Sequence, residues 1–241
     1  SAIVRLCGRK TPSFVSANTS ANFEWGRAMS LYDRAFELVI GSEGGFQRDP
    51  RDRGNWTTGR IGHGVNKGTK YGITAMAYPH LDIANLTIDD AKGIYFDDYW
   101  TPAGCKSLPE IAAYPHFDAS VNHGVSRAIK FLQGAIGAGP DGIIGPQTRR
   151  KIQEANPRDM FRNMLALRIK FYMDLDHLND IYGLGWSRRS VDVIMDAMDM
   201  AADDTPEAPL TTDALLARYM NHPDIPANSL QYAIAALLRD F

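Results

Sequence analysis

The segment of residues 32–74 constrains this chain most, because it joins a predicted helix to a glycine-rich loop through one carboxylate. Apolar side chains within residues 32–41 recur four, seven and eight positions after the first, which predicts an amphipathic helix. Gly41 stands where a helix C-terminus favours a left-handed residue. Glu43 follows after Ser42, so its carboxylate is expected to lie between this helix end and two glycines.

The helix end is expected to weaken Glu43 as an acid. The C-terminus of a helix carries about half a negative charge, which disfavours a second one nearby. The apolar neighbours Ile40 and Phe46 would desolvate the carboxylate and act in the same direction. The predicted result is a raised pKa, as a general acid at neutral pH requires. The alternative is an ordinary solvated turn after a helix.

Two further carboxylates and a threonine complete the candidate set. Asp49 and Asp52 follow Glu43 in the loop, and Thr69 begins the closing stretch of the segment. A weak acid, a second carboxylate and a hydroxyl that can hold water are the groups that glycoside hydrolysis uses. Asp52 is the preferred second carboxylate. Asp49 precedes a proline, which favours extended backbone, and is expected to fix the loop instead.

Three motifs in this segment resemble those of glycoside hydrolase family 108, the N-acetylmuramidases of phage endolysins and secretion-linked bacterial enzymes. They are residues 43–46 (EGGF), 49–54 (DPRDRG) and 69–74 (TKYGIT). The order of acid, aspartate and threonine is also similar to that of phage-type lysozymes. The resemblance covers roughly residues 30–190. It implies catalytic roles for Glu43, Asp52 and Thr69, and a lysozyme-like, mainly α fold.

The chain departs from the family pattern after Gly54, where residues 55–68 come before the threonine. Thr57 and Thr58 therefore compete with Thr69 for its role, and Thr69 is favoured because Gly-Ile-Thr follows shortly after it. The inserted loop is rich in glycine and basic residues. It is either a solvated surface loop or a flap whose cations meet the carboxylates of peptidoglycan stems.

Later segments supply candidates for substrate binding. Residues 86–100 resemble the second helix of the family, and its aromatic side chains are either core or sugar-stacking groups. A helix over 111–128, broken by Pro115, is similar to the family's F-D-x-x-x-N-x-G over residues 117–124 and places two polar residues four apart on one face. The substrate-binding candidates are Tyr71, Tyr95, Trp100, Asp118, Asn122 and His123.

The remaining pattern predicts a mainly α chain with at most a small β-hairpin, placed within residues 55–73. Residues 141–148 read as a tight helix connection or as part of a peptidoglycan-recognition segment, and a helix over 159–177 and a last one over 190–201 follow. The predicted divisions are an N-terminal arm (1–29), a lysozyme-like catalytic region (30–120), a helical lobe resembling a predicted peptidoglycan-binding region and packed with it as one unit (121–200), and a linker with a C-terminal helical extension (201–241).

Composition excludes several classes of function. A net charge of −2 gives no reason to expect nucleic acid as a partner. No apolar run approaches the ~18 residues of a membrane span. No signal peptide is expected either. We therefore predict that the protein is made in the cytosol and delivered to the wall by a holin, a virion or a secretion system. Cys7 and Cys105 are expected to be unrelated thiols, and no metal or cofactor is expected.

The predicted reaction is hydrolysis of the β-1,4 bond between N-acetylmuramic acid and N-acetylglucosamine in peptidoglycan strands. Glu43 would protonate the glycosidic oxygen, Asp52 would stabilise the transition state or position water, and Thr69 would hold that water. One rival is a lytic transglycosylase. Another is a non-catalytic wall-binding or virion protein on the same fold. The two terminal extensions favour a protein partner of some kind.

Overall fold

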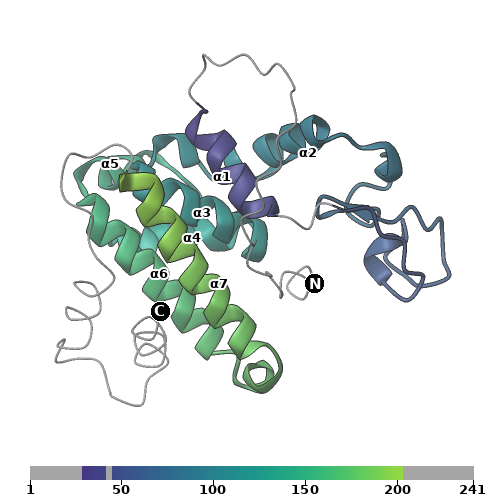
Figure 1. Cartoon of the computed structure of the whole chain (residues 1–241). Coiled ribbons are helices and arrows are strands. Elements are labelled where there is room, and N and C mark those ends of the chain that lie inside the picture. Colours follow the sequence, from purple (N-terminus) through teal and green to yellow (C-terminus); the bar gives the residue numbers. More distant parts are fainter. Residues whose placement is uncertain (1–28, 42–44, 203–241) are drawn as a thin grey trace, which may run out of the picture. The chain divides into compact units, whose positions relative to one another are not determined.

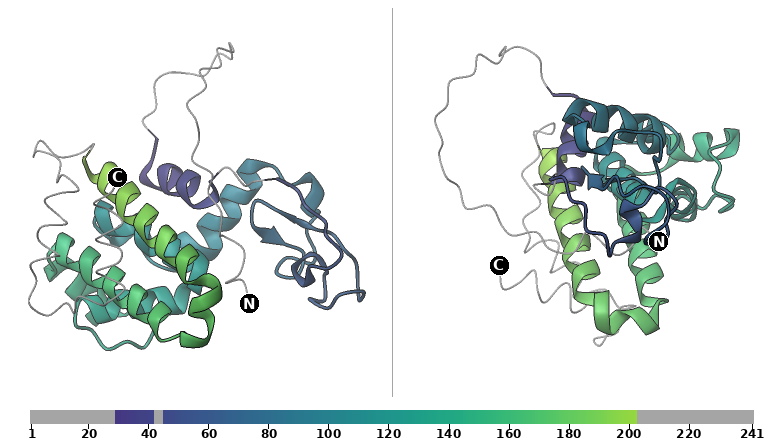
Figure 2. Two further views of the ribbon diagram at one scale, coloured as in Figure 1. Left: turned by 60° about the horizontal axis from the view of Figure 1, so that its bottom comes forward. Right: turned by 90° about the vertical axis from the view of Figure 1, so that its right-hand side faces the viewer.

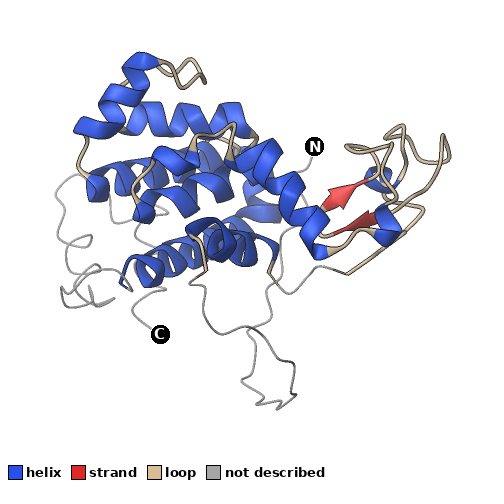
Figure 3. Cartoon of the chain, turned by 90° about the horizontal axis from the view of Figure 1, so that it is seen from above, coloured by secondary structure: helices blue, strands red, loops and turns tan. Residues whose placement is uncertain are grey.

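The computed structural model describes residues 29–41 and 45–202, which form two compact units that divide between Lys106 and Ser107. Within these described residues there are seven α-helices and one two-stranded antiparallel sheet (Figure 3). The prediction of a mainly α fold with a small hairpin is therefore confirmed. The predicted N-terminal arm and C-terminal extension lie almost wholly outside the described part of the chain.

Helix α1 (Leu31–Ile40) opens the first unit and forms as its apolar spacing predicts. A capping box fixes its start, because the Ser30 side chain accepts from the N–H of Asp33 while the Asp33 side chain accepts from the N–H of Ser30. Gly41 ends it with its N–H bonded to the Glu37 carbonyl. Tyr32 and Phe36 lie on the buried face, so the helix is held to its unit by aromatic packing.

Helix α2 (Ile88–Tyr95) supplies the partner surface. The Thr87 and Asp90 side chains form a second capping box, and the helix continues as a π-helical turn over Phe96–Trp100. The Tyr32 ring lies 5.1 Å from that of Trp100 and the Phe36 ring 5.7 Å from that of Tyr95, measured between centroids. These ring contacts form the core of the first unit beside α1.

The sheet consists of β1 (Thr69–Lys70) and β2 (Ile73–Thr74), joined by a two-residue turn. Tyr71 and Gly72 have φ of 51° and 74°, the pattern of a type I′ hairpin turn. A Cβ at position 72 would lie 2.5 Å from the hydroxyl oxygen of Tyr95, so glycine is required there by space as well as by backbone. An isolated bridge adds Gln47 alongside Thr69, which brings the start of the loop to the hairpin.

The second unit is a helical bundle around α3. Its helices are α3 (Glu110–His123), α4 (Val125–Ala135), α5 (Pro146–Glu154), α6 (Pro157–Met173) and α7 (Asp176–Ala202). Helix α3 packs against α4, α6 and α7, and the last two also pack on each other (Figures 1 and 2). Residues 112–120 of α3 are buried throughout, as expected for a helix surrounded by three others.

Two helix boundaries differ from the prediction. Helix α3 continues through Pro115, and the chain breaks instead at Gly124, whose φ is 83°. Burial of the helix on all sides offsets the backbone hydrogen bond that a proline removes. The predicted last helix over residues 190–201 is the C-terminal part of α7, which begins already at Asp176.

Two smaller expectations concern membranes and thiols. No helix in the described ranges has the length and apolar character needed to cross a bilayer. Cys105 is a buried free thiol, and burial raises its pKa above the ordinary value. Cys7 falls outside the described residues.

Candidate active site

The predicted general acid, Glu43, lies outside the described residues, which stop at Gly41 and resume at Gly45. Its place beside the other candidates, and its raised pKa, therefore stay predictions. The residues that follow it are described in full, and they hold both of its predicted partners.

Asp52 is a buried carboxylate with a donor on each oxygen. It caps the short 3-10 helix η2 (Arg53–Asn55), and its Oδ1 accepts the Gly54 N–H at 2.9 Å. Its Oδ2 accepts from Nε2 of Gln47 at 3.2 Å. Only 8% of the residue is exposed. N–H donors at both oxygens favour the ionised carboxylate.

Asn55 is the fully buried centre of the loop, with 0% exposure. Its Nδ2 donates to Oε1 of Gln47 at 2.8 Å and to the Asp49 carbonyl at 3.0 Å. Nε2 of Gln47 donates to Oδ1 of Asn55 at 3.1 Å, so the two side-chain amides pair with each other. The pair connects Gln47, at the start of the loop, to the first residue of the insertion.

Thr69 joins this pair from the far end of the insertion. Its Oγ1 donates to Oδ1 of Asn55 at 2.6 Å, and its backbone exchanges two hydrogen bonds with Gln47. Gln47, Asp52, Asn55 and Thr69 thus form one continuous hydrogen-bonded set, which we call the Asp52–Thr69 network. It brings together the two described residues for which catalytic roles are predicted.

The side chains of the competing residues bond elsewhere in the loop, although the Asp49 backbone contacts Gln47 and Asn55. Asp49 forms a half-exposed ion pair with Arg51, at 3.0 Å, and its Oδ1 also accepts the Arg51 N–H. Thr57 accepts the Val65 N–H on Oγ1 at 3.0 Å. Thr58 donates from Oγ1 to the His63 carbonyl at 2.8 Å. The hydrogen bonds of these two threonines are therefore internal to the inserted loop.

The aromatic candidates lie in or beside the core of the first unit. Trp100 is 4% and Tyr95 7% exposed, and both rings contact those of α1. The Tyr95 hydroxyl donates to the Tyr71 carbonyl at 3.0 Å and so supports the hairpin turn. Core packing accounts for these contacts of Tyr95 and Trp100. Tyr71 itself is half-buried, and sugar binding by the three aromatics stays a prediction.

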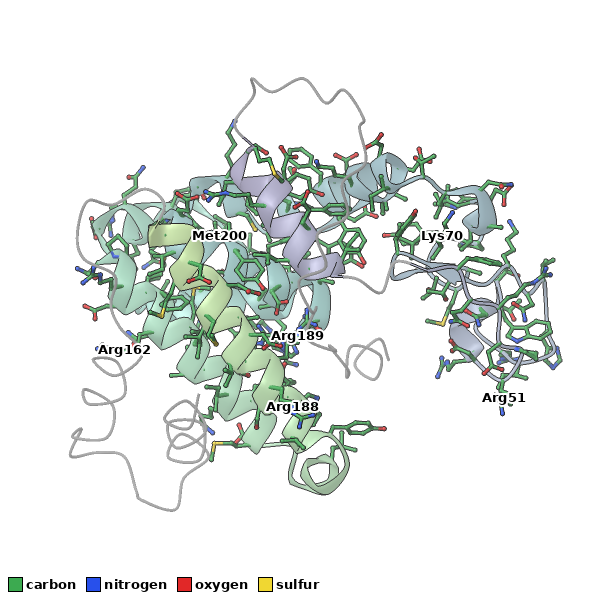
Figure 4. The ribbon with its side chains drawn as sticks, viewed as in Figure 1. Arg51, Lys70, Arg162, Arg188, Arg189 and Met200 are labelled. Carbon is green, nitrogen blue, oxygen red and sulfur yellow. The ribbon has the colours of Figure 1, made fainter. Side chains whose placement is uncertain are left out.

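Asp118 is the centre of a buried ion cluster in the second unit. Its carboxylate pairs with Arg168 of α6 at 2.6 Å and with Arg189 of α7, which is labelled in Figure 4. Burial raises the pKa of Asp118, but the guanidinium groups of Arg189 and Arg168 outweigh it and hold the pKa below its ordinary value. The cluster ties α3 to the two helices that follow later in the chain.

The other two α3 candidates have internal partners. Asn122 donates from Nδ2 to the Asp118 carbonyl at 2.8 Å. The Nε2 atom of His123 lies 3.1 Å from the Tyr172 hydroxyl oxygen, and aromatic rings surround the imidazole. Burial, assisted by the charge of Arg168, lowers the pKa of His123 to about 3, so the imidazole is neutral at physiological pH. Among the described residues no group of three potential metal-ligating side chains occurs.

Gln47 and Asn55 are the site residues that the sequence pattern does not reveal. Neither is a charged or nucleophilic residue, and Asn55 marks only the boundary of the insertion. Their role depends on the return of the chain at Thr69. Chemically, the network holds a carboxylate and a threonine oxygen in a fixed relation, which is an arrangement able to orient water or a sugar hydroxyl.

Comparison with known proteins identifies two consecutive regions. Residues 36–124 match the family described as glycosyl hydrolase 108, and residues 127–191 match the predicted peptidoglycan domain. A solved structure, that of Brucella abortus SagA, is similar with a TM-score of 0.59 and 25% identity, covering 72% of this chain and 97% of that one. No curated protein matches the sequence. The chain is a peptidoglycan hydrolase whose residues 36–124 belong to the glycosyl hydrolase 108 family and whose residues 127–191 belong to that of the predicted peptidoglycan domain.

Proposed function

We propose that this hydrolase is an N-acetylmuramidase, which cleaves the β-1,4 bond between N-acetylmuramic acid and N-acetylglucosamine by general acid catalysis. The observation that carries the proposal is the Asp52–Thr69 network, which follows Glu43 directly in the chain. A glycosidase of this kind needs one protonated acid and one ionised carboxylate. Glu43 is assigned the first role and Asp52 the second.

The two carboxylates are suited to opposite protonation states. The position of Glu43 in the sequence, after a predicted helix end and near apolar residues, is expected to favour its protonated form. The amide donors on Asp52 favour its ionised form. Protonation of the glycosidic oxygen by Glu43 would leave an oxocarbenium-like centre, which the negative charge of Asp52 stabilises.

Thr69 is assigned to the water. Because its hydroxyl hydrogen is donated to Asn55, its oxygen lone pairs are left to accept a hydrogen bond from a water molecule. The amide pair of Gln47 and Asn55 fixes both Asp52 and Thr69 and leaves little conformational entropy to lose in the transition state. In this proposal the enzyme serves phage-type bacterial lysis, delivered by a holin, a virion or a secretion system.

Product analysis tests the assignment. Purified sacculi are digested with the protein, and the fragments are reduced with borohydride and identified by mass spectrometry. A muramidase yields fragments whose reducing-end muramic acid becomes muramitol. Fragments ending in 1,6-anhydromuramic acid would instead establish a lytic transglycosylase. Intact sacculi after prolonged incubation would favour the non-catalytic alternative.

A further inference from the structure

We propose that the loop between Trp56 and Asn66, here called the flap loop, and the cations beside it bind the carboxylates of the peptide stems carried by muramic acid. The enzyme would thereby prefer stem-bearing glycan to stem-free glycan. The inference rests on the proposed muramidase function and adds a substrate preference to it. It assigns a role to residues 56–66 of the insertion, which are not members of the Asp52–Thr69 network.

Charge is strongly segregated into this part of the chain. Residues 47–70 contain six basic and two acidic residues, a formal charge of +4, within a chain whose net charge is −2. The rest of the chain therefore carries −6. A local positive field on an otherwise acidic protein attracts an anionic ligand to that one surface.

Only some of these cations are available to a ligand. Lys67 donates from Nζ to the Pro79 carbonyl at 2.7 Å, Lys70 donates to that of Ala84 at 3.1 Å, and Arg51 pairs with Asp49. These three hold the loop region together, with Arg51 and Lys70 at opposite ends of it in Figure 4.

Three arginines remain, namely Arg48, Arg53 and Arg60. Each is exposed, and within the described ranges none has a hydrogen bond or an ion pair from its side chain. Guanidinium groups bind carboxylates with two parallel hydrogen bonds, which suits them to the carboxylates of a peptide stem.

The flap loop is held in one conformation by its own hydrogen bonds. An isolated bridge pairs Trp56 with Asn66, and the Thr57 N–H bonds the Val65 carbonyl at 3.0 Å. Gly64 has φ of 77°, and a Cβ there would lie 2.6 Å from Thr57 Oγ1, so only glycine fits. A preformed loop loses less entropy on binding than one that must fold around its ligand.

The base of the flap loop is bonded to the catalytic network. The Asn55 carbonyl accepts the N–H groups of Lys67 at 2.9 Å and Gly68 at 3.2 Å. The side chain of the same Asn55 accepts from Thr69. A ligand held by the flap loop is therefore adjacent to the residues assigned to catalysis. Peptide stems are attached to muramic acid, one of the two sugars at the bond that is cleaved.

The flap loop also carries two exposed apolar side chains: Ile61 is 56% and Val65 is 55% exposed. Cations beside apolar groups suit an anionic lipid surface as well as a stem peptide with its alanine methyl groups. The shared Asn55 links the loop to the site of sugar cleavage. The stem is thus the occupant that the structure favours.

The test uses glycan strands from sacculi without teichoic acid, either with their stems or stripped of them by an amidase. The flap variant combines Arg48→Gln, Arg53→Gln and Arg60→Gln. The matched control is Arg162→Gln, an exposed arginine of α6 whose side chain bonds its helix neighbours Asp159 and Asn163. The readout is the ratio of kcat/KM on stem-bearing strands to that on stem-free strands, at low and high ionic strength.

We expect the flap variant to lower this ratio at least tenfold at low ionic strength and less at high ionic strength, and the control to leave it at the wild-type value. An unchanged ratio in the flap variant would overturn the proposal. If the ratio is unchanged and the flap variant also loses binding to vesicles containing phosphatidylglycerol, the loop binds a membrane surface instead.

Failure of the muramidase proposal would look different, because the wild-type protein would then either cleave neither preparation or release fragments with 1,6-anhydromuramic acid ends. Retention on immobilised glycan strands, with their stems or stripped of them by the amidase, would still decide the role of the flap loop. Stronger retention of the wild type than of the flap variant on stem-bearing strands alone would support it. Equal retention of the two proteins on both preparations would overturn it.

Discussion

Thr69 donates a hydrogen bond from its Oγ1 to Oδ1 of Asn55 at 2.6 Å, across fourteen residues of sequence. The bond closes the insertion that separates the threonine from the aspartate, so Thr69 reaches the same network as Asp52. The inserted residues form a loop that leaves and returns beside Asn55. The extra length therefore need not displace the threonine from its predicted role.

Replacement of Thr69 tests that role. We expect Thr69→Ala to lower kcat on stem-free glycan by about tenfold or more, because a positioned water loses one of its partners. Thr69→Ser keeps the hydroxyl and should recover most of the rate. Thr58→Ala is the matched control, since the side-chain partners of Thr58 in the described structure, His63 and Arg60, belong to the flap loop. A Thr69→Ala enzyme with the wild-type kcat would exclude the threonine from the reaction.

The two aspartates of the loop should separate rate from stability. Asp52→Asn retains a side-chain acceptor for the Gly54 N–H but loses the charge, so we expect kcat to fall about 100-fold or more with a small change in Tm. Asp49→Asn loses the exposed ion pair with Arg51, a kind of pair that adds little to stability. It should lower Tm slightly and leave most of the activity. The reverse pattern would exchange the two roles.

The buried cluster of the second unit predicts a large loss of stability. Asp118→Asn leaves Arg168 and Arg189 without their common counter-ion, and we expect the free energy of unfolding to fall by about 3–5 kcal/mol. Asp159→Asn is the control, because its pair with Arg162 is exposed and contributes less than about 1 kcal/mol. Urea denaturation measures both. Equal effects would show that the cluster adds no more than a surface pair.

His123 predicts a pH dependence of stability. Its pKa is about 3 in the folded protein and roughly 6.5 when unfolded. Between these values the unfolded chain binds a proton that the folded chain does not, so stability falls as pH drops through this window. His123→Gln should reduce the slope by up to about 1.4 kcal/mol per pH unit. An identical slope in His123→Gln would contradict the buried neutral imidazole.

The sequence predicts the elements of this fold better than their ends. The apolar spacing of α1 and the capping residues of α2 are local signals, and both helices form as they indicate. Pro115 is also a local signal, yet α3 continues through it. Local rules fail there because three packed helices decide the outcome. The break at Gly124, by contrast, depends on one residue, because its φ of 83° is a backbone conformation that favours glycine.

In the candidate site, too, local signals in the sequence identify some residues and contacts between distant segments identify the others. Asp52 and Thr69 were identifiable from motif spacing, because their residue types carry the chemistry. Gln47 and Asn55 were not, because an amide pair acquires its function only when the chain returns to it. Asp118 was assigned to substrate, and its contacts with Arg168 and Arg189 follow from helix packing that no local pattern encodes. That cluster also joins the glycosyl hydrolase 108 region to the predicted peptidoglycan domain.

The most direct test of the central claim is the kcat of the Glu43→Gln variant on purified sacculi, measured by release of reducing ends. The substitution keeps the shape of the side chain and removes its proton-donating carboxyl group. We expect a loss of about 10²–10⁴-fold or more in kcat, with an unchanged Tm and unchanged binding to sacculi. A folded Glu43→Gln protein that retained a third of the wild-type rate would contradict it.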